Sequence, residues 1–550
     1  MRTPTRALLL ALLVAPVLGA QTPARRAVRA SDVYHLRDVR DPRISPDGRW
    51  VAYTVSTADS AKDRNQTDVW MASWDGTQHI RLTHTDAESE SAPRWSPDGR
   101  WLAFRSGRGE DVKGSQVWLL DRRGGEARQL TDYKGGVSDF VWSPDGARLA
   151  LVVDDPDPAD LDTTKKSKTK PPIVVDRYRF KQDYRGYLGA RRSHIHVFDV
   201  ASKKGEQITA GIYDESDPAW SPDGRRIAFV SKRGEDPDRT QNFDVWVVDA
   251  APGAEPRQLT TFEGEDNGGL AWSPDGRWIA FVRSGEPKYY AYQQDRLAIV
   301  PSAGGEARIL TASLDRAVSD PAWTADGSAI VVTVEDDRTR YAARVRVRDG
   351  AVTPLTRGKQ TVHGVDVGPG GALAMLVAND TMPAEVHALD RGALRRLTHH
   401  NDSLFAGLQL GTVEELTSRS KDGTEVHSLL TKPHGFREGQ KYPLLLRIHG
   451  GPNGQDEHAF DIERELFAAN GYVVLEVNYR GSSGRGSDFQ KAIFADWGNL
   501  EVVDLLGAVD EAIRIGVADP DRLGIGGWSY GGILTNYTIA TTPRFKAATS

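Results

Sequence analysis

Residues 271–282, Ala-Trp-Ser-Pro-Asp-Gly-Arg-Trp-Ile-Ala-Phe-Val, decide the fold of most of this chain. An apolar segment runs into Ser273-Pro274-Asp275-Gly276, and a second apolar segment follows at once. Serine first, proline second and glycine fourth are the preferences of a type I β-turn. The stretch therefore predicts two antiparallel strands joined by a tight turn.

The same turn recurs along the chain at a nearly constant spacing. Ser-Pro-Asp-Gly begins at residues 45, 96, 143, 221 and 273, and weaker copies occupy residues 324–327 and 368–371. Val-Trp pairs at 69, 117 and 245 indicate a third strand, and Leu-Thr pairs at 82, 130, 259, 310, 355 and 397, with Ile208-Thr209, indicate a fourth. Four short strands in a unit of roughly 45 residues are typical of a propeller blade. The seven turns predict an all-β, seven-bladed propeller over residues 30–405.

The tryptophans support this prediction. Eleven of the 14 occupy recurring slots of the repeat, where they would pack between neighbouring blades. Trp74, Trp497 and Trp528 fall outside those slots. A pair of β-sandwiches is the alternative for a stretch so rich in strands, but sandwiches do not repeat their turns at a fixed period.

One interval of the repeat is longer than the others. From Asp145 to Asp223 the step is 223 − 145 = 78 residues, which indicates an insertion over about residues 154–193. Its lysine run favours a solvated loop. The alternative is that its end, residues 177–180 (Arg-Tyr-Arg-Phe), reaches the other domain and contacts substrate, since functional residues are often on loops.

Composition excludes several classes of function. The 70 Lys and Arg are outnumbered by 76 Asp and Glu, so no basic field suggests a nucleic-acid partner. The chain has no cysteine, which excludes disulfides and thiolate metal sites. No group of histidines and carboxylates shows ligand spacing, so we expect no metal and no cofactor.

The first residues predict a cleaved signal peptide over residues 1–20. Arg2 and Arg6 precede an apolar run from Ala7 to Leu18, and Gly19-Ala20 supplies small residues for cleavage. The run is well short of the roughly 20 residues that span a bilayer. We therefore expect a secreted or periplasmic protein with no membrane span after cleavage.

After the last Leu-Thr pair the pattern changes to strands alternating with helices. We expect strands at 442–448, 472–478 and 522–526, and helices at 459–470, 500–515 and 533–540, after a hairpin around 421–424. Such alternation predicts a parallel sheet covered by helices. Residues 406–550 are accordingly interpreted as an α/β-hydrolase domain, present here only in its N-terminal part.

A nucleophile elbow stands where the last of these strands meets a helix. The motif is Gly527-Trp528-Ser529-Tyr530-Gly531-Gly532. The turn is so sharp that small residues are needed around the serine, whose hydroxyl is left exposed above the sheet. Ser529 is therefore the candidate catalytic nucleophile, and the helix beginning at Tyr530 directs its positive end toward developing negative charge.

The motif His449-Gly450-Gly451-Pro452 follows the strand at 442–448 and resembles the oxyanion loop of lipases and esterases. The backbone N–H groups of Gly451 and Tyr530 are the predicted donors to the oxyanion, and one such donor is typically worth about 10²- to 10³-fold in rate. His449 is expected to hold the loop rather than to transfer protons, since the motif positions backbone. Residues 478–484 (NYRGSSG) lack the Gly-Lys-Ser/Thr ending of a phosphate loop.

Together, the propeller repeat and the motifs at 449–452, 478–484 and 527–532 resemble the prolyl oligopeptidase family of serine peptidases, from about residue 30 to residue 550. The histidine in the oxyanion loop makes the chain most similar to the acylaminoacyl-peptidase and dipeptidyl-peptidase branches. The resemblance implies cleavage of short peptides, with the propeller restricting access to the site. No prediction of oligomeric state follows.

One departure from the family pattern affects the expected activity. In α/β-hydrolases the acid and the histidine follow the serine in the chain, yet residues 530–550 contain no Asp, Glu or His. We therefore expect these 550 residues to be a fragment with negligible activity, because a serine without its base is a poor nucleophile. Two other functions stay open, a non-catalytic envelope scaffold with a degenerate hydrolase domain, and an esterase or lipase.

Overall fold

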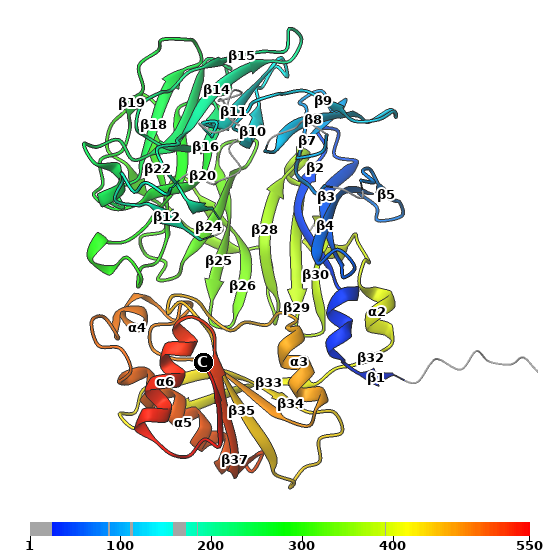
Figure 1. The fold of residues 1–550 in the computed structure, drawn as a ribbon, viewed down its shortest axis with the longest axis vertical. Helices are drawn as coiled ribbons and strands as arrows, with labels where there is room; N and C mark the ends of the chain where they lie inside the picture. Colours follow the sequence, from blue (N-terminus) through cyan, green and yellow to red (C-terminus); the bar gives the residue numbers. More distant parts are fainter. Residues whose placement is uncertain (1–24, 86–87, 110–113, 158–171, 184, 391) are drawn as a thin grey trace, which may run out of the picture.

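The computed structural model describes residues 25–550 except 86–87, 110–113, 158–171, 184 and 391. The chain forms a seven-bladed β-propeller followed by an α/β-hydrolase domain, which lies against the side of the ring formed by the sixth and seventh blades (Figure 1). The predicted signal peptide, residues 1–20, and the lysines at 165, 166, 168 and 170 of the insertion lie outside the described residues.

Each blade is an antiparallel sheet of four strands, which pair in the order in which they occur along the chain. The first four blades are β2 (Arg37–Ile44), β3 (Trp50–Asp59), β4 (Arg64–Ser73) and β5 (His79–Arg81); β6 (Glu90–Trp95), β7 (Trp101–Ser106), β8 (Gln116–Asp121) and β9 (Arg128–Gln129); β10 (Val137–Trp142), β11 (Arg148–Asp154), β14 (Ser193–Asp199) and β15 (Lys204–Gln207); and β16 (Glu215–Trp220), β17 (Arg226–Ser231), β18 (Asp244–Asp249) and β19 (Arg257–Gln258).

The last three blades continue the pattern. They are β20 (Asp266–Trp272), β21 (Trp278–Arg283), β22 (Arg296–Pro301) and β23 (Arg308–Ile309); β24 (Val318–Trp323), β25 (Ala329–Asp336), β26 (Thr339–Arg346) and β27 (Val352–Pro354); and β28 (Thr361–Val367), β29 (Leu373–Asn379), β30 (Met382–Asp390) and β31 (Ala393–Arg396). Blades 6 and 7 are joined into one sheet by a single parallel pairing, Arg340 with Thr361. Short 3₁₀ helices lie between some strands, η2 (Pro237–Arg239), η3 (Pro287–Tyr289) and η4 (Pro369–Gly371).

The repeated turns adopt the predicted conformation. In the quoted stretch the Gly276 N–H donates to the Ser273 carbonyl at 2.8 Å, and Ser273 Oγ donates to Asp275 Oδ1 at 2.5 Å. Gly276 has φ 70°, a left-handed conformation that favours glycine. The serine and aspartate thus close the turn from inside, which explains why both recur.

The threonines of the Leu-Thr and Ile-Thr pairs fasten the outer edge of every blade. Each hydroxyl accepts the N–H of a third-strand residue 12 to 15 positions earlier, at 2.8 to 3.0 Å. The seven donor and acceptor pairs are Val69 with Thr83, Val117 with Thr131, Ile195 with Thr209, Val245 with Thr260, Leu297 with Thr311, Ala342 with Thr356, and Val386 with Thr398.

Removing one of these hydroxyls should destabilise the propeller. Thr311 is fully buried and accepts the Leu297 N–H at 2.9 Å. Thr311→Val keeps the shape but leaves that N–H unpaired, so we expect the free energy of unfolding to fall by about 1–3 kcal/mol in urea titrations. Thr311→Ser, which keeps the hydroxyl, is the matched control and should lose less. Equal losses in the two variants would contradict a role for the hydroxyl.

Neighbouring blades are joined by tryptophans, as the sequence predicts. The indole N–H of five inner-strand tryptophans donates to a carbonyl on the inner strand of the preceding blade, at 2.9 to 3.3 Å; they are Trp95, Trp142, Trp220, Trp272 and Trp323. Blades 1 and 7 close the ring without exchanging a strand. Their seam includes the Ile44 N–H on Asp366 at 2.7 Å and two 2.9 Å bonds between Arg37 and Asn401.

The insertion in blade 3 folds back onto the propeller. Its described residues include a short hairpin, β12 (Lys181–Gln182) with β13 (Gly186–Tyr187). Arg177 makes a two-pronged ion pair with Asp238 of blade 4, at 2.7 and 2.6 Å. This part of the insertion is therefore anchored over the neighbouring blade.

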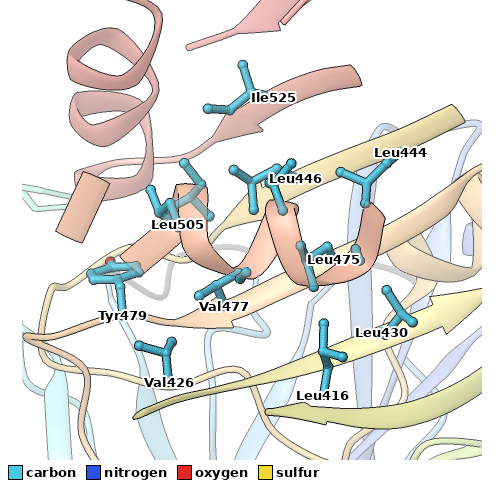
Figure 2. Packing of buried hydrophobic residues seen from close by; sticks show 14 of the residues in the cluster. Leu416, Val426, Leu430, Leu444, Leu446, Leu475, Val477, Tyr479, Leu505 and Ile525 are labelled. Atoms are coloured by element: carbon cyan, nitrogen blue, oxygen red, sulfur yellow. The ribbon is translucent and has the colours of Figure 1, made fainter. Parts of the chain in front are cut away.

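The hydrolase domain contains a six-stranded sheet in the order β33-β34-β36-β35-β37-β38. Its strands are β33 (Thr412–Arg419), β34 (Glu425–Lys432), β35 (Tyr442–Ile448), β36 (Val473–Asn478), β37 (Ala518–Gly527) and β38 (Ala547–Thr549), and its helices are α3 (Ile462–Ala469), α4 (Ser487–Lys491), α5 (Leu500–Arg514) and α6 (Tyr530–Thr541). Leucine, valine and isoleucine side chains of the sheet pack against α5 (Figure 2). Parallel pairing of β36, β35, β37 and β38 confirms the predicted parallel sheet.

Several boundaries differ from the prediction, including the start of α6, which is Tyr530 rather than Ile533. Helix α3 begins at Ile462 rather than Ala459, because Asp461 caps it by accepting the Arg464 N–H at 2.7 Å. Strand β37 begins at Ala518, four residues before the predicted start. Between the domains, β1 (Arg26–Ala27) pairs with β32 (Leu408–Gln409), and the 3₁₀ helix η1 (Ala30–His35) and α2 (Asp402–Ala406) flank this link.

Candidate active site

The elbow places Ser529 on a strained turn between β37 and α6. Strand β37 ends at Gly527 and α6 begins at Tyr530. Ser529 itself has φ 55° and ψ −120°, a conformation that non-glycine residues rarely adopt. Its side chain is exposed, and Trp528 beside it is 84% exposed. Strain at one exposed serine is typical of a nucleophile held in place by its surroundings.

The glycines around Ser529 are required by close backbone approach. A Cβ on Gly531 would lie 2.0 Å from the Ile448 carbonyl oxygen, and a Cβ on Gly527 would lie 2.6 Å from the Gly531 carbonyl carbon. For a Cβ on Gly532, the nearest atom would be the Ser550 Oγ, at 3.3 Å. The first two glycines therefore let the strand, the turn and the neighbouring strand meet.

The predicted oxyanion loop lies directly beside the elbow. Strands β35 and β37 are parallel neighbours, and Ile448 pairs with Gly527, so His449 leaves the sheet next to the elbow. A Cβ on Gly450 would lie 3.3 Å from the Ser529 Cβ. Gly451 has φ 122°, which favours glycine, and is joined to Pro452 by a cis peptide bond.

Both predicted oxyanion donors are available. The Gly451 N–H makes no hydrogen bond within the described part of the chain. The Tyr530 N–H is the first of α6 and has no intrahelical acceptor. A groove of about 450 Å³ opens over the elbow, bordered by residues that include Trp528, Ser529 and Ile533.

His449 is enclosed within the loop rather than directed at Ser529. Its Nδ1 lies 2.8 Å from the Gly450 carbonyl, and its Nε2 lies 2.9 Å from Ser482 Oγ. The ring stacks on Tyr479 at 4.5 Å, and the Tyr479 hydroxyl donates to the His449 carbonyl at 2.9 Å. These contacts suit a neutral imidazole that donates from Nδ1 and accepts at Nε2.

The pKa of His449 should make this loop sensitive to acid. Burial lowers the pKa of His449 to about 4, whereas in the unfolded chain it is about 6.5. As the pH falls, the unfolded chain takes up the proton first, so the stability contributed by neutral His449 is complete above about pH 6.5 and is lost toward pH 4. Between pH 7 and 4.5, we expect the free energy of unfolding of the wild type to fall by about 2–3 kcal/mol more than that of His449→Gln. Identical losses in urea titrations at the two pH values would contradict this assignment.

The motif at 478–484 contacts the oxyanion loop and the residues around it. Arg480 forms an ion pair with the buried carboxylate of Asp504 at 2.7 Å. Asn478 bonds both backbone groups of Asp456, at 2.7 and 3.0 Å. With Tyr479 and Ser482 on His449, the motif holds the oxyanion loop against the sheet. A role in phosphate binding has no support in these contacts.

Comparison with known proteins assigns the family. The sequence profile of the prolyl oligopeptidase family matches residues 458–550, and that of the TolB beta propeller domain matches residues 184–396. YuxL of Bacillus subtilis strain 168, described as an uncharacterized peptidase, is 31% identical over 543 residues, which cover 95% of this chain and 82% of YuxL. The chain belongs to the prolyl oligopeptidase family. This member is therefore assigned to a family of peptidases.

Two further relatives agree with this membership. Dipeptidyl-peptidase 5 of Porphyromonas gingivalis is 26% identical over 529 residues, which cover 90% of this chain and 74% of that protein. The solved structure of an acylaminoacyl peptidase in complex with Z-Gly-Gly-Phe-chloromethyl ketone superimposes with a TM-score of 0.78 at 25% identity, over 95% of this chain and 78% of that one. The expected resemblance to these two branches is thereby confirmed.

Some residues at the site of this prolyl oligopeptidase family member were missed by the sequence analysis. The Tyr530 hydroxyl donates to Glu501 at 2.5 Å, and burial raises the pKa of the Glu501 carboxyl. The Trp497 ring packs edge-on against Tyr530, with 5.0 Å between the centroids. The sequence did contain a pattern that could have identified Glu501. Glu501 and Asp504 stand next to apolar positions of the predicted amphipathic helix. Carboxylates at positions that face a core are usually paired.

Two features are absent from the described part of this family member. Among residues 25–550, less the gaps given above, no three or more His, Asp or Glu side chains are grouped as metal ligands. Over the same ranges, no helix has the length and apolar character needed to cross a bilayer.

Proposed function

We propose that this protein is an exported serine peptidase that hydrolyses short peptides through an acyl-enzyme on Ser529. The observation that carries the proposal is one exposed, strained serine at a strand-to-helix elbow, beside two backbone N–H groups that have no acceptor among the described residues. Membership in a peptidase family and the peptide-like inhibitor bound to the acylaminoacyl peptidase both support peptides over other acyl substrates.

In the proposed reaction, Ser529 Oγ attacks the carbonyl carbon of the scissile amide while its proton passes to a histidine base. The carbonyl oxygen becomes an oxyanion that accepts hydrogen bonds from the N–H groups of Gly451 and Tyr530. The amine leaves with the proton from the histidine, and water then hydrolyses the acyl-enzyme. His449 is not this base in the proposal, because both of its ring nitrogens are engaged by Gly450 and Ser482.

The propeller is proposed to restrict access to the site. It contains a cavity of about 980 Å³, bordered by inner-strand residues of blades 1 to 4 and by the insertion. Arg177, Arg179 and Arg185 of the insertion are among its lining residues. For residues 177–180, the placement supports substrate contact from the propeller side, because a peptide held in the cavity would lie near Arg177 and Arg179, whose hydrogen bonds join them to blade 4.

Export is proposed from residues 1–20 alone, on the charged start and apolar run described above. Edman sequencing of the protein recovered from the periplasm or medium should give a first residue close to Gln21. Recovery from the cytosol with Met1 intact would refute export without affecting the proposed chemistry.

A panel of substrates tests the reaction class. The full-length gene product should hydrolyse chromogenic peptides, and comparison of free and N-acetylated dipeptides by kcat/KM should separate a dipeptidyl-peptidase from an acylaminoacyl-peptidase preference. Acyl esters with no peptide bond are the control. Turnover of the esters without any turnover of the peptides would favour the esterase alternative and refute the proposed function.

A further inference from the structure

The loop that joins β21 to β22 in blade 5, residues 284–295, leaves the propeller and packs against the hydrolase domain. It contains the 3₁₀ helix η3, after which Tyr292, Gln293 and Gln294 are all buried. Tyr292 belongs to the hydrophobic core of the hydrolase domain, although it comes from the propeller. Two neighbouring residues of this loop are linked to the two predicted oxyanion donors, Tyr292 through Trp497 and Gln293 through Asn453.

The first contact leads to Tyr530. The Tyr292 hydroxyl accepts a hydrogen bond from the indole N–H of Trp497. Trp497 in turn packs edge-on against the ring of Tyr530, with an interplanar angle of 86°. The other side of the Tyr530 side chain is fixed, because its hydroxyl donates to buried Glu501. Trp497 is thus held between the propeller and the residue whose N–H starts α6.

The second contact leads to Gly451. The Gln293 carbonyl accepts the side-chain amide of Asn453 at 3.0 Å. Asn453 lies two residues after Gly451 in the oxyanion loop, and its Oδ1 accepts from buried Gln490 at 2.6 Å. Pro452 is the one residue that separates Asn453 from Gly451. A shift of Asn453 would therefore move Gly451.

We propose that Tyr292 and Gln293 are positioning residues, through which the propeller fixes the two N–H donors of the oxyanion hole. The inference rests on the proposed function of Ser529, Gly451 and Tyr530. An oxyanion hole stabilises the transition state only when its donors point at the developing charge, and small displacements are costly. Losing either contact should reduce stabilisation of the transition state by the oxyanion hole, while ground-state binding of the peptide stays intact.

Tyr292→Phe in the full-length gene product tests the first contact. It removes the acceptor for Trp497 and keeps the ring in the core. We expect kcat per titrated active site to fall about 10-fold, with KM within about 2-fold of wild type. Tyr290→Phe is the matched control, since Tyr290 stands in the same loop and is 54% exposed. If Tyr292 had only a structural role, the variant would contain fewer active sites, as counted by active-site titration, but each remaining site would keep its wild-type turnover.

Two further measurements separate positioning from damage to the fold. Affinity for a peptide aldehyde, which forms a tetrahedral adduct with serine, should fall in Tyr292→Phe by the same factor as kcat. Trp497→Phe should give at least as large a loss, because it also removes indole packing on Tyr530, and the double variant should lose no more than Trp497→Phe alone, because the hydrogen bond is already absent there. Additive losses would overturn the proposed path through Trp497.

Asn453→Ala tests the second contact, with exposed Asn470→Ala as its control. It should also lower kcat per titrated site about 10-fold without raising KM. Wild-type turnover in both Tyr292→Phe and Asn453→Ala would overturn the inference, and an effect in only one would overturn it for the other donor. If the wild type itself shows no Ser529-dependent turnover, the proposed function fails instead.

Discussion

Ser529→Ala should abolish peptide hydrolysis by the full-length gene product, with kcat lowered by about 10⁶-fold. The change removes the hydroxyl group and nothing else, and without that group no acyl-enzyme can form. Alanine tolerates the φ of 55° no worse than serine does, so the elbow and its oxyanion donors should persist. KM, where it can be measured, and the circular dichroism spectrum should match those of wild type.

Ser202→Ala is the control for this change. Ser202 lies in a propeller turn, where its hydroxyl donates to Asp199 at 2.7 Å, and its variant should keep wild-type kcat. Residual hydrolysis by Ser529→Ala within about 100-fold of wild type would assign the chemistry to another residue, because loss of a triad nucleophile costs far more.

Arg480→Met should produce the largest loss of stability among single changes near the site. Asp504 is fully buried, and it accepts the Arg480 Nε and Nη2 groups at 3.0 and 2.7 Å. Without the guanidinium, the buried Asp504 carboxylate keeps, among the residues that the structure describes, only the Arg480 N–H and the Ser420 hydroxyl as donors. Breaking a buried ion pair from one side typically costs about 3–5 kcal/mol. Urea unfolding of the full-length protein should show a loss of that size.

Two variants test this reasoning. Arg514→Met removes an exposed guanidinium that pairs with Glu511, and it should change the free energy of unfolding by less than about 0.5 kcal/mol. Arg480→Met combined with Asp504→Leu removes both charges and should recover much of the loss, since replacing both partners of a buried pair is often nearly neutral. A double variant as unstable as Arg480→Met would show that the uncompensated charge was not the cause.

The propeller was predictable because its constraints are local and repeat. The serine and aspartate of each Ser-Pro-Asp-Gly turn bond one another within three residues. Each threonine of the Leu-Thr pairs reaches a strand 12 to 15 residues earlier. The elbow was predictable for the same reason. Strand, Gly527, Ser529, Gly531 and helix are contiguous in sequence, and the sharp turn restricts which residues fit.

Contacts between distant segments could not be predicted. Asn453 meets the Gln293 carbonyl across 160 residues, and Tyr292 accepts from Trp497 across 205 residues, with no periodic pattern linking them. One hint was present. Trp497 and Trp528 fall outside the blade repeat, and both lie at the candidate site. A tryptophan outside the repeat therefore indicated a position where the side chain serves the candidate site rather than blade packing.

Mass spectrometry after treatment of the full-length gene product with a fluorophosphonate tests the acyl-enzyme on Ser529 most directly. The reagent reacts with activated serines, so the account predicts one adduct per molecule, on the peptide containing residues 527–532, and its absence from Ser529→Ala. An unmodified Ser529 in protein that hydrolyses peptides, or an adduct on another serine, would contradict the account.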